Sequence, residues 1–164
     1  MENKTIIEKI KRKFDDHVLS VNETSDMLTV TVDRSIIHDT IFFLKEDTTL
    51  QFNFLTTLCG IHYPEMPLPL GVVYHMHNLY QNTRIRIKTF VSIGDPTVKT
   101  VTDLFSAANW MERETYDFYG IIFEGHPNLK RILNVDYLDY FPMRKEYPLE
   151  DSTREDKDDR FFGR

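Results

Sequence analysis

The spacing of apolar residues alternates along the chain between the period of a helix and the period of a strand. The first segment has helical spacing and is predicted to be an amphipathic helix that ends at residues 15–17. Its apolar face carries Ile6, Ile7, Ile10 and Phe14. Residues 27–34 alternate strictly between apolar and polar, which predicts a half-buried strand. Ser35 is expected to cap a second helix with these apolar residues: Ile36, Ile37, Ile41, Phe42 and Leu44.

A second strand and a hairpin are predicted in the middle of the chain. Alternation at Leu50, Phe52 and Phe54, running into Leu55 and Leu58, predicts a second strand or a strand followed by a turn, which leads into residues 59–64. Residues 65–70 contain prolines and are expected to be a connector. Residues 71–80 and 84–91 then form the hairpin, with Ile85 and Ile87 on one side and Arg84, Arg86 and Lys88 on the other. This sheet should therefore have one buried face and one wet, partly basic face.

A third helix is expected to begin at a cap formed by Thr100 or Thr102 and to end at Gly120. Its inner face would carry Val101, Leu104, Phe105, Ala108 and Met111. The periodicity is lost after Gly120. A turn is expected at residues 125–127 and one helical turn at 128–133, and the charge-rich segment after Pro148 should be extended or disordered on its own.

These elements predict an α+β fold, with a mixed or antiparallel sheet covered by helices on one face and an extended, irregular C-terminal arm. We expect an α+β domain at residues 1–120 and place the C-terminal arm at residues 121–164.

The composition narrows the classes of function. The chain has 164 residues, of which 41% are hydrophobic and 28% charged, as in an ordinary globular domain. Its net charge of −6 argues against nucleic acid as the main partner, because phosphate binding needs clustered Lys and Arg. With Cys59 as the single cysteine, the chain cannot form an internal disulfide or a thiolate cluster for zinc or iron–sulfur.

The sequence offers no membrane anchor. The apolar residues near the N-terminus are spaced rather than continuous, unlike a signal peptide, and no apolar run approaches the roughly 18–20 residues of a membrane helix. Any contact with a membrane is therefore expected to be indirect.

Charged residues gather at the end of the third predicted helix, where Glu112, Arg113, Glu114 and Asp117 lie close in sequence. Arg113 and Asp117 can pair because residues four apart are neighbours on a helix. Glu112 and Asp117 would serve as an acid–base pair only if their environments separated their pKa values. We favour an ion-pair network that ties the helix to the tail or to a partner.

Two other sites are weaker candidates. His75 and His77 share one face of a strand and could bind zinc if His62 or His126 supplied a third ligand, although half-exposed strand histidines are the favoured interpretation. Cys59 could be a nucleophile, but a cysteine among apolar residues is more often inert core. The chain has no glycine-rich phosphate loop, GxSxG motif or dinucleotide fingerprint.

A basic patch could bind single-stranded nucleic acid together with nearby tyrosines. Its members would be Arg84, Arg86, Lys88, Lys99, Lys130, Arg131, Arg144 and Lys145. The acidic net charge favours the other use of Tyr and Arg, as anchors in protein–protein interfaces.

The stretch from Trp110 to Leu149 resembles a known family. The similarity rests on Glu112-Arg113-Glu114, residues 117–121, Phe123, Gly125-His126-Pro127, residues 129–133 and residues 142–149, in that order. These motifs are similar to those of the 30 kDa subunit family of proton-translocating NADH:quinone oxidoreductase (respiratory complex I). The resemblance marks the following residues as signature and subunit-interface positions: Glu112, Arg113, Glu114, Asp117, Gly120, Gly125, His126, Pro127, Lys130, Arg131, Arg144, Lys145, Tyr147 and Pro148.

The resemblance implies a member of the peripheral arm of that complex, with no catalytic, cofactor or metal site of its own. FMN and the iron–sulfur clusters would be held by partner subunits. The chief neighbours would be the large subunit that forms the quinone site and the nearby iron–sulfur subunits. The expected location is the cytoplasmic side of the bacterial inner membrane. The alternatives are the equivalent subunit of a membrane-bound hydrogenase or related dehydrogenase, and a stand-alone metal enzyme that uses His75, His77 and Glu112 or Asp117.

Overall fold

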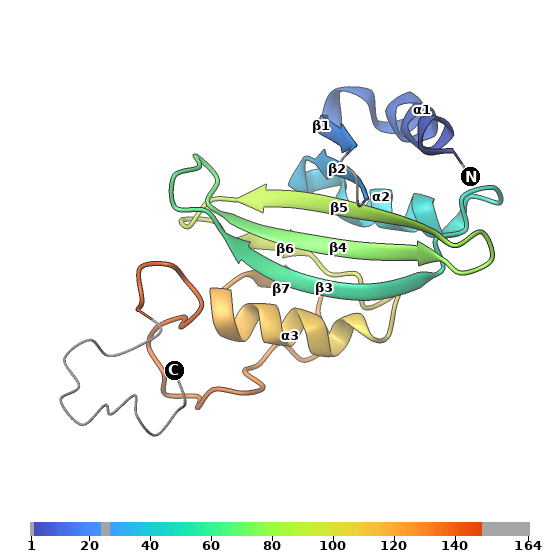
Figure 1. The fold of residues 1–164 in the computed structure, drawn as a ribbon. Helices are drawn as coiled ribbons and strands as arrows, with labels where there is room; N and C mark the ends of the chain where they lie inside the picture. The colour runs from blue at the N-terminus through green and yellow to red at the C-terminus, as the bar shows by residue number, and fades with distance from the viewer. Residues whose placement is uncertain (1, 24–26, 149–164) are drawn as a thin grey trace, which may run out of the picture.

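The computed structural model describes residues 2–23 and 27–148, which form a five-stranded sheet, a separate pair of short strands and three α-helices (Figure 1). The elements are α1 (Asn3–Phe14), η1 (Asp15–His17), β1 (Val18–Glu23), β2 (Leu28–Val32), η2 (Arg34–Ile36), α2 (Ile37–Glu46), β3 (Phe54–His62), β4 (Leu70–Asn78), β5 (Thr83–Val91), β6 (Thr97–Lys99), α3 (Ala108–Tyr119) and β7 (Ile122–Glu124). The α+β prediction is confirmed. The predicted tail beyond Pro148 lies outside the described residues.

The main sheet is mixed, with the strand order β1-β2-β5-β4-β3. The predicted hairpin is present as β4 and β5, which pair antiparallel from Leu70 opposite Val91 to Asn78 opposite Thr83. β2 and β5 are the parallel pair of this sheet. β6 and β7 form a second, parallel pair.

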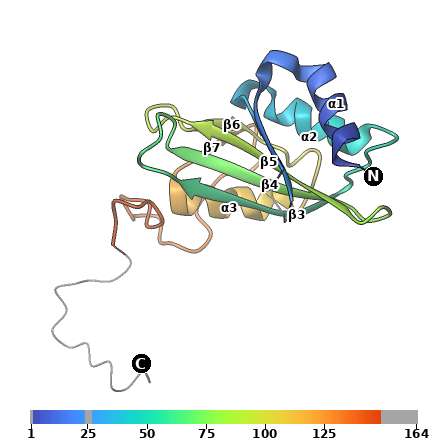
Figure 2. The same ribbon diagram turned by 45° about the horizontal axis from the view of Figure 1, so that its top comes forward.

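One face of the sheet carries the core, as predicted. Ile85 and Ile87 are fully buried on it, together with Val30 and Tyr74. Figure 2 shows α3 and the β6–β7 pair behind strands β3, β4 and β5, and α2 also packs its buried residues into this layer. The opposite face carries the predicted basic side chains of β5.

α3 packs closely on the edge strand β3. The amide of Leu58 lies 3.2 Å from the sulfur of Met111. Gly60 is required for this approach, because a Cβ atom there would overlap the ring of Tyr119. The absence of a side chain at Gly60 thus lets the last turn of α3 rest on the sheet.

Several predicted boundaries are wrong. The strand predicted to include Leu50 and Phe52 begins only at Phe54, because Gln51 has a φ of 44° and turns the chain after α2, although both apolar side chains are buried. β3 continues beyond Leu58 to His62, so the strand extends into the segment that was expected to follow it. β1 was not predicted, because a register shift between Val18 and Ser20 interrupts its alternation.

The predicted helix caps are also wrong. Ser35 donates its amide to the carboxylate of Asp33, which caps η2, and α2 starts at Ile37 without a side-chain cap. α3 starts at Ala108, because residues 101–107 form turns. Its predicted end is confirmed: Gly120 adopts a left-handed conformation with a φ of 73°.

Candidate functional site: the end of helix α3 and the C-terminal arm

The described part of the C-terminal arm is held against α3 by a buried carboxylate. Asp117 is fully buried, and its Oδ2 atom accepts hydrogen bonds from the amides of Ile132, Leu133 and Asn134, at 3.0, 2.8 and 2.9 Å. Its Oδ1 atom accepts from the side-chain amide of Asn134 at 3.0 Å. These contacts replace the single helical turn predicted at residues 128–133. Folding of this part of the arm therefore depends on a side chain of α3.

Arg131 completes the shell of donors around Asp117. Its Nη1 atom lies 2.8 Å from Asp117 Oδ1 and also donates to the Asp117 carbonyl. Its Nη2 atom donates to the carbonyl of Leu138 at 2.7 Å. Burial favours a higher pKa for Asp117, but the hydrogen bonds from Asn134, Leu133 and Arg131 outweigh it and hold that pKa well below its usual range. The carboxylate is therefore ionised and saturated with donors.

Arg113 holds the same segment from one turn earlier in the helix. Its guanidinium donates to the carbonyls of Lys130 and Arg131, both at 3.1 Å, and lies 5.2 Å from the ring centre of Trp110. The predicted Arg113–Asp117 pair is thus replaced by two separate attachments to the arm. The charged residues at the end of α3 therefore tie the helix to the arm, as the sequence suggested.

A second set of contacts fixes the arm near Gly120. Phe141 packs so closely there that a Cβ atom on Gly120 would lie 2.5 Å from its ring. Arg144 lies over the Phe141 ring at 4.7 Å and donates through Nε to the Tyr119 carbonyl at 2.8 Å. The amide of Lys145 donates to His62 Nδ1 at 2.9 Å, which joins the arm to the end of β3.

Glu112 lies on a different side of α3 from the arm contacts. It is fully buried, and it accepts from the Val101 amide at 2.8 Å and from the Thr100 hydroxyl at 2.5 Å. Burial raises its pKa to about 7, against the opposing effect of these two hydrogen bonds. The pKa values of Glu112 and Asp117 are therefore separated, as an acid–base pair would need. Neither carboxyl group is exposed to a substrate, however, and each is bound by structural partners.

The remaining signature residues surround this region. His126 lies 3.1 Å from the Asn109 carbonyl and accepts from the Asn128 amide, and Gly125 has a φ of 85° in the turn before it. Tyr147 stacks near Tyr140, with ring centres 4.9 Å apart. Exposed side chains are found at Glu114, Pro127, Lys130, Lys145 and Pro148.

Several apolar side chains of this region face solvent. Trp110 is 60% exposed and Tyr137 is 86% exposed. Leu133 and Val135 are exposed between the arm contacts. Large exposed apolar side chains commonly mark a protein-binding surface. We call Trp110, Leu133, Val135 and Tyr137 the arm surface.

Some residues of the network could not be found from the sequence. Asn134 provides both an amide and a side-chain donor to Asp117, and Thr100 binds Glu112, yet both are ordinary polar residues outside any motif. Phe141 also lies outside the sequence motifs, so its contact with Gly120 could not be predicted. The glycine at position 120 was the one sign in the sequence that another residue could pack closely against the end of α3.

The proposed zinc ligands do not converge. His75 and His77 share a face of β4, but His62 binds the arm and His126 binds residues near the start of α3. Within residues 2–23 and 27–148, no group of three or more His, Cys, Asp or Glu side chains is placed to hold a metal ion. The expectation that Cys59 is buried core is wrong, because β3 is an edge strand and its thiol faces outward.

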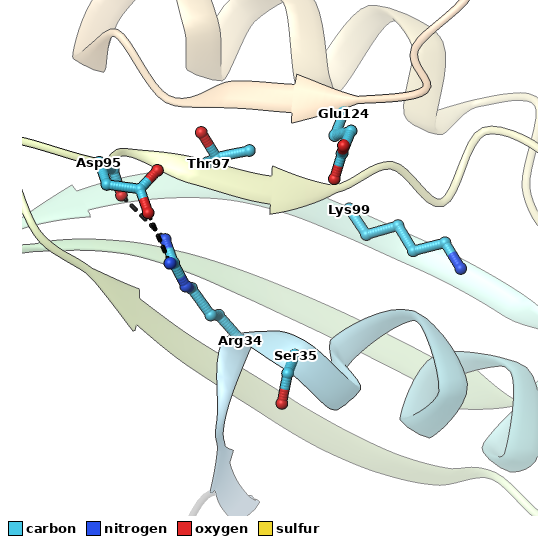
Figure 3. A pocket seen from close by; sticks show the side chains of 6 residues that line it. All are labelled: Arg34, Ser35, Asp95, Thr97, Lys99 and Glu124. Atoms are coloured by element: carbon cyan, nitrogen blue, oxygen red, sulfur yellow. Dashed lines mark hydrogen bonds and ion pairs between the residues drawn. The ribbon is translucent and has the colours of Figure 1, made fainter.

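The basic residues do not form one patch. Arg84, Arg86 and Lys88 lie on the open face of the sheet, whereas Arg131 and Arg144 are used inside the arm. Lys99 lines a separate depression of about 370 Å³ (Figure 3). The basic residues that were considered for a single-stranded nucleic-acid site are therefore not brought together in one place.

That depression lies between η2 and the β6–β7 pair. Arg34 reaches across it to Asp95, with 2.5 Å between Nη2 and Oδ2, while Lys99 extends away from this pair (Figure 3). Glu124 and Thr97 border the opposite side. Because Arg34 and Asp95 neutralise one another, the depression presents no convergent set of charges.

Comparison with known proteins gives consistent matches along most of the chain. The sequence model of the family described as "Respiratory-chain NADH dehydrogenase, 30 Kd subunit" matches residues 30–153. The chain is 39% identical over 149 residues to the C subunit of NADH-quinone oxidoreductase from Roseiflexus sp. (strain RS-1), covering 91% of this chain and 86% of that protein.

Two solved structures share the fold. A trypsin-resistant fragment (1-134) of Nqo5 superposes with a TM-score of 0.68 and 30% identity, over 79% of this chain and 100% of the fragment. A chain of the membrane-bound sulfane sulfur reductase, an archaeal respiratory membrane complex, gives a TM-score of 0.73 at 22% identity, over 91% of this chain and 87% of its own. At that identity the second likeness concerns the fold alone.

Proposed function

Since the chain belongs to the family of the 30 kDa subunit of respiratory-chain NADH dehydrogenase, we propose that it is a cofactor-free scaffold of that enzyme's peripheral arm. It would hold the quinone-site subunit and neighbouring iron–sulfur subunits in position for electron transfer from NADH to quinone, which the whole complex couples to proton translocation. The chain itself would contribute no catalytic residue. FMN and the iron–sulfur clusters would belong to its partners.

The observation that carries this proposal is the pairing of a fixed framework with an exposed apolar surface. Arg113, Asp117 and Arg131 fix the arm by hydrogen bonds to at least seven backbone or side-chain groups, so the arm surface is presented on an ordered support. A preorganised surface binds a partner with a smaller loss of conformational entropy. Large aromatic side chains such as Trp110 and Tyr137 are the usual anchors of such interfaces.

The proposed place of the chain is the cytoplasmic side of the bacterial inner membrane, reached through its partners. In the part of the chain that the structure describes, no helix is long and apolar enough to cross a bilayer. In this proposal the protein contacts of the arm surface attach the chain to the complex.

The proposal is tested by recovering the tagged full-length chain from detergent-solubilised membranes. We expect the quinone-site and iron–sulfur subunits to be recovered with it in stoichiometric amounts. The double variant Trp110→Ser/Tyr137→Ser should reduce that recovery at least about tenfold, since loss of two interface anchors costs more than about 1.4 kcal/mol. Tyr80→Ser is the matched control, because Tyr80 is 83% exposed but lies in the turn between β4 and β5.

Two outcomes would replace the proposal. Recovery of a hydrogenase large subunit in place of the quinone-site subunit would assign the chain to a related complex. Stoichiometric metal, or turnover by the purified chain without partners, would support the stand-alone enzyme instead.

A further inference from the structure

His62 joins the end of β3 to the C-terminal arm through one nitrogen of its ring. The side chain is 2% exposed, and its Nδ1 atom accepts a hydrogen bond from the Lys145 amide at 2.9 Å. The carboxylate of Glu146, the next residue of the arm, lies 3.4 Å from the same nitrogen. Nδ1 therefore has two neighbours of opposite kinds, an N–H donor and a carboxylate acceptor.

The protonation state of the ring decides which of these neighbours Nδ1 can bind. A neutral imidazole has one nitrogen that accepts and one that donates, whereas both nitrogens of an imidazolium donate. The Lys145 contact therefore requires a neutral His62 with its hydrogen on Nε2. Once Nδ1 carries a proton it can no longer accept from the amide, and the Glu146 carboxylate becomes the acceptor beside it.

The other nitrogen of the ring does not hold His62 in place. Nε2 is buried and has no hydrogen-bond partner in the part of the chain that the structure describes. The ring is therefore joined to its surroundings by hydrogen bonds at Nδ1 alone. A change of partner at Nδ1 is not resisted by a second hydrogen bond.

The arm just before this junction is attached to α3 independently of His62. The Met143 amide donates to the Phe118 carbonyl at 3.2 Å, and Arg144 donates through Nε to the Tyr119 carbonyl at 2.8 Å. Neither contact uses a group that ordinarily changes charge between about pH 5 and pH 8. A proton on His62 would therefore act on residues 145–147 next to a fixed point at residues 143–144.

The arm and α3 place charged and titratable groups near the ring. Glu146 contacts Nδ1, the side chain of Lys145 is exposed, and Arg144 is directed to the end of α3. Tyr119 of α3 stays neutral in this pH range, because burial raises the pKa of its phenol. A buried cation is costly without a counter-charge, and Glu146 would supply one to a protonated His62.

The opposite side of the ring contributes no such contact within the described residues. β4 places Leu70 opposite His62 in the register of the sheet. In the loop after β3, the ring of Tyr63 packs near Phe90 with 6.2 Å between ring centres, and Glu65 is exposed. The arm is therefore the element that responds to the charge of the ring.

We propose that His62 is a proton-controlled latch of the C-terminal arm. The neutral ring holds the arm by the Lys145 amide, and the ring that has taken a proton from solvent holds it by the Glu146 carboxylate. The arm stays attached in both states, but its backbone at residues 145–147 is displaced. This inference concerns the chain itself and does not depend on the proposed scaffold role.

Nuclear magnetic resonance of the isotope-labelled full-length chain tests both states. Proton–nitrogen spectra of the His62 ring should show hydrogen on Nε2 alone at about pH 8 and on both nitrogens at about pH 5, the range in which histidines change charge. Hydrogen exchange of the Lys145 amide, corrected for its intrinsic pH dependence, should become at least about tenfold faster over this range because the acceptor is lost. The Met143 amide should keep its protection.

Two variants separate the ring from the carboxylate. His62→Asn offers Oδ1 to the Lys145 amide but cannot be protonated, so the corrected exchange of that amide should not change with pH. Glu146→Gln removes a counter-charge whose side chain is 44% exposed, so the faster exchange should begin about half a pH unit lower. Glu8→Gln, which removes an exposed carboxylate of α1, is the matched control and should leave the onset unchanged. Circular dichroism checks that the variants remain folded.

Four results would each overturn the latch. A neutral ring with its hydrogen on Nδ1 would exclude the Lys145 contact, and a ring that stays neutral down to about pH 5 would exclude the switch. Unchanged exchange of the Lys145 amide while the ring gains its proton would show that His62 does not hold that amide. Loss of protection at both Met143 and Lys145 would show that the arm detaches instead of changing partner.

Discussion

Arg131 and Asp117 form an ion pair whose carboxylate is fully buried, with 2.8 Å between Nη1 and Oδ1. Three consecutive backbone amides, from residues 132–134, bind the same carboxylate. The Arg131–Asp117 ion pair and these amides therefore fix the position of residues 131–134 against α3. Removing one member of such a buried pair leaves the other charge without compensation, which typically costs about 3–5 kcal/mol.

The variant Asp117→Asn should loosen the arm while the sheet domain stays folded. An asparagine retains the size of the aspartate but removes its charge and turns an NH2 group toward groups that are themselves donors. We expect trypsin to cleave after Lys130 and Arg131 at least about tenfold faster than in the wild type, with little change in the circular dichroism of the sheet. Glu114→Gln is the control, because that side chain on the same helix is exposed. Equal cleavage rates in the two variants would contradict the role assigned to Asp117.

Glu112 should make stability depend on pH in the neutral range. Its pKa in the folded chain is raised to about 7 by burial, against 4.5 for an ordinary glutamate. The folded state therefore keeps the proton while the unfolded state has released it, and the free energy of unfolding falls as pH rises from about 4.5 to about 7. The decrease in the free energy of unfolding that Glu112 causes over this pH range is about 3 kcal/mol.

Glu112→Gln should remove that part of the pH dependence, because glutamine stays neutral and can still accept from the Val101 amide. Urea unfolding of both proteins at pH 5, 6, 7 and 8 measures the difference. We expect the stability of the variant relative to the wild type to increase with pH, and to level off above about pH 7.5. A constant difference between the two proteins across this range would show that Glu112 does not bind a proton on folding.

Gly120 should tolerate no side chain. Its φ of 73° is unfavourable for other residues, by roughly 1–2 kcal/mol, and an added Cβ would lie 2.5 Å from Phe141. Gly120→Ala is therefore expected to lower the free energy of unfolding by more than about 2 kcal/mol and to release Phe141 from the helix end. Gly94→Ala is the matched control, since no atom lies within 4 Å of the added Cβ there. Equal effects of the two substitutions in thermal unfolding would refute this account.

The fold was predictable where side-chain periodicity and glycine geometry act locally. The β4–β5 hairpin follows from the alternation of buried and basic residues, and the end of α3 follows from the freedom of Gly120 to adopt positive φ. The start of α3 was not predictable. Thr100 looks like a helix cap, but its hydroxyl is bound by Glu112, twelve residues later in the sequence.

The candidate site was predictable in its residues but not in its connections. The cluster of charged residues at the end of α3 predicted that Arg113 and Asp117 belong to one ion-pair network. Their spacing of four residues on a helix predicted that they pair with each other. Their actual partners lie 14–18 residues away, since Arg113 binds the carbonyls of Lys130 and Arg131, and Asp117 binds Arg131. Such contacts depend on how the arm folds back after β7, which no local pattern reveals.

Arg113→Ala should impair assembly more than electron transfer. The substitution removes two hydrogen bonds to the arm and the contact with Trp110, so it weakens both the support and an exposed anchor of the arm surface. We expect the amount of intact complex on native gels to fall several-fold, while quinone reduction per assembled complex stays close to that of the wild type. Arg12→Ala, on the exposed side of α1, is the control for loss of a surface cation. Normal assembly with lost quinone reduction would instead place Arg113 in the chemistry of the complex.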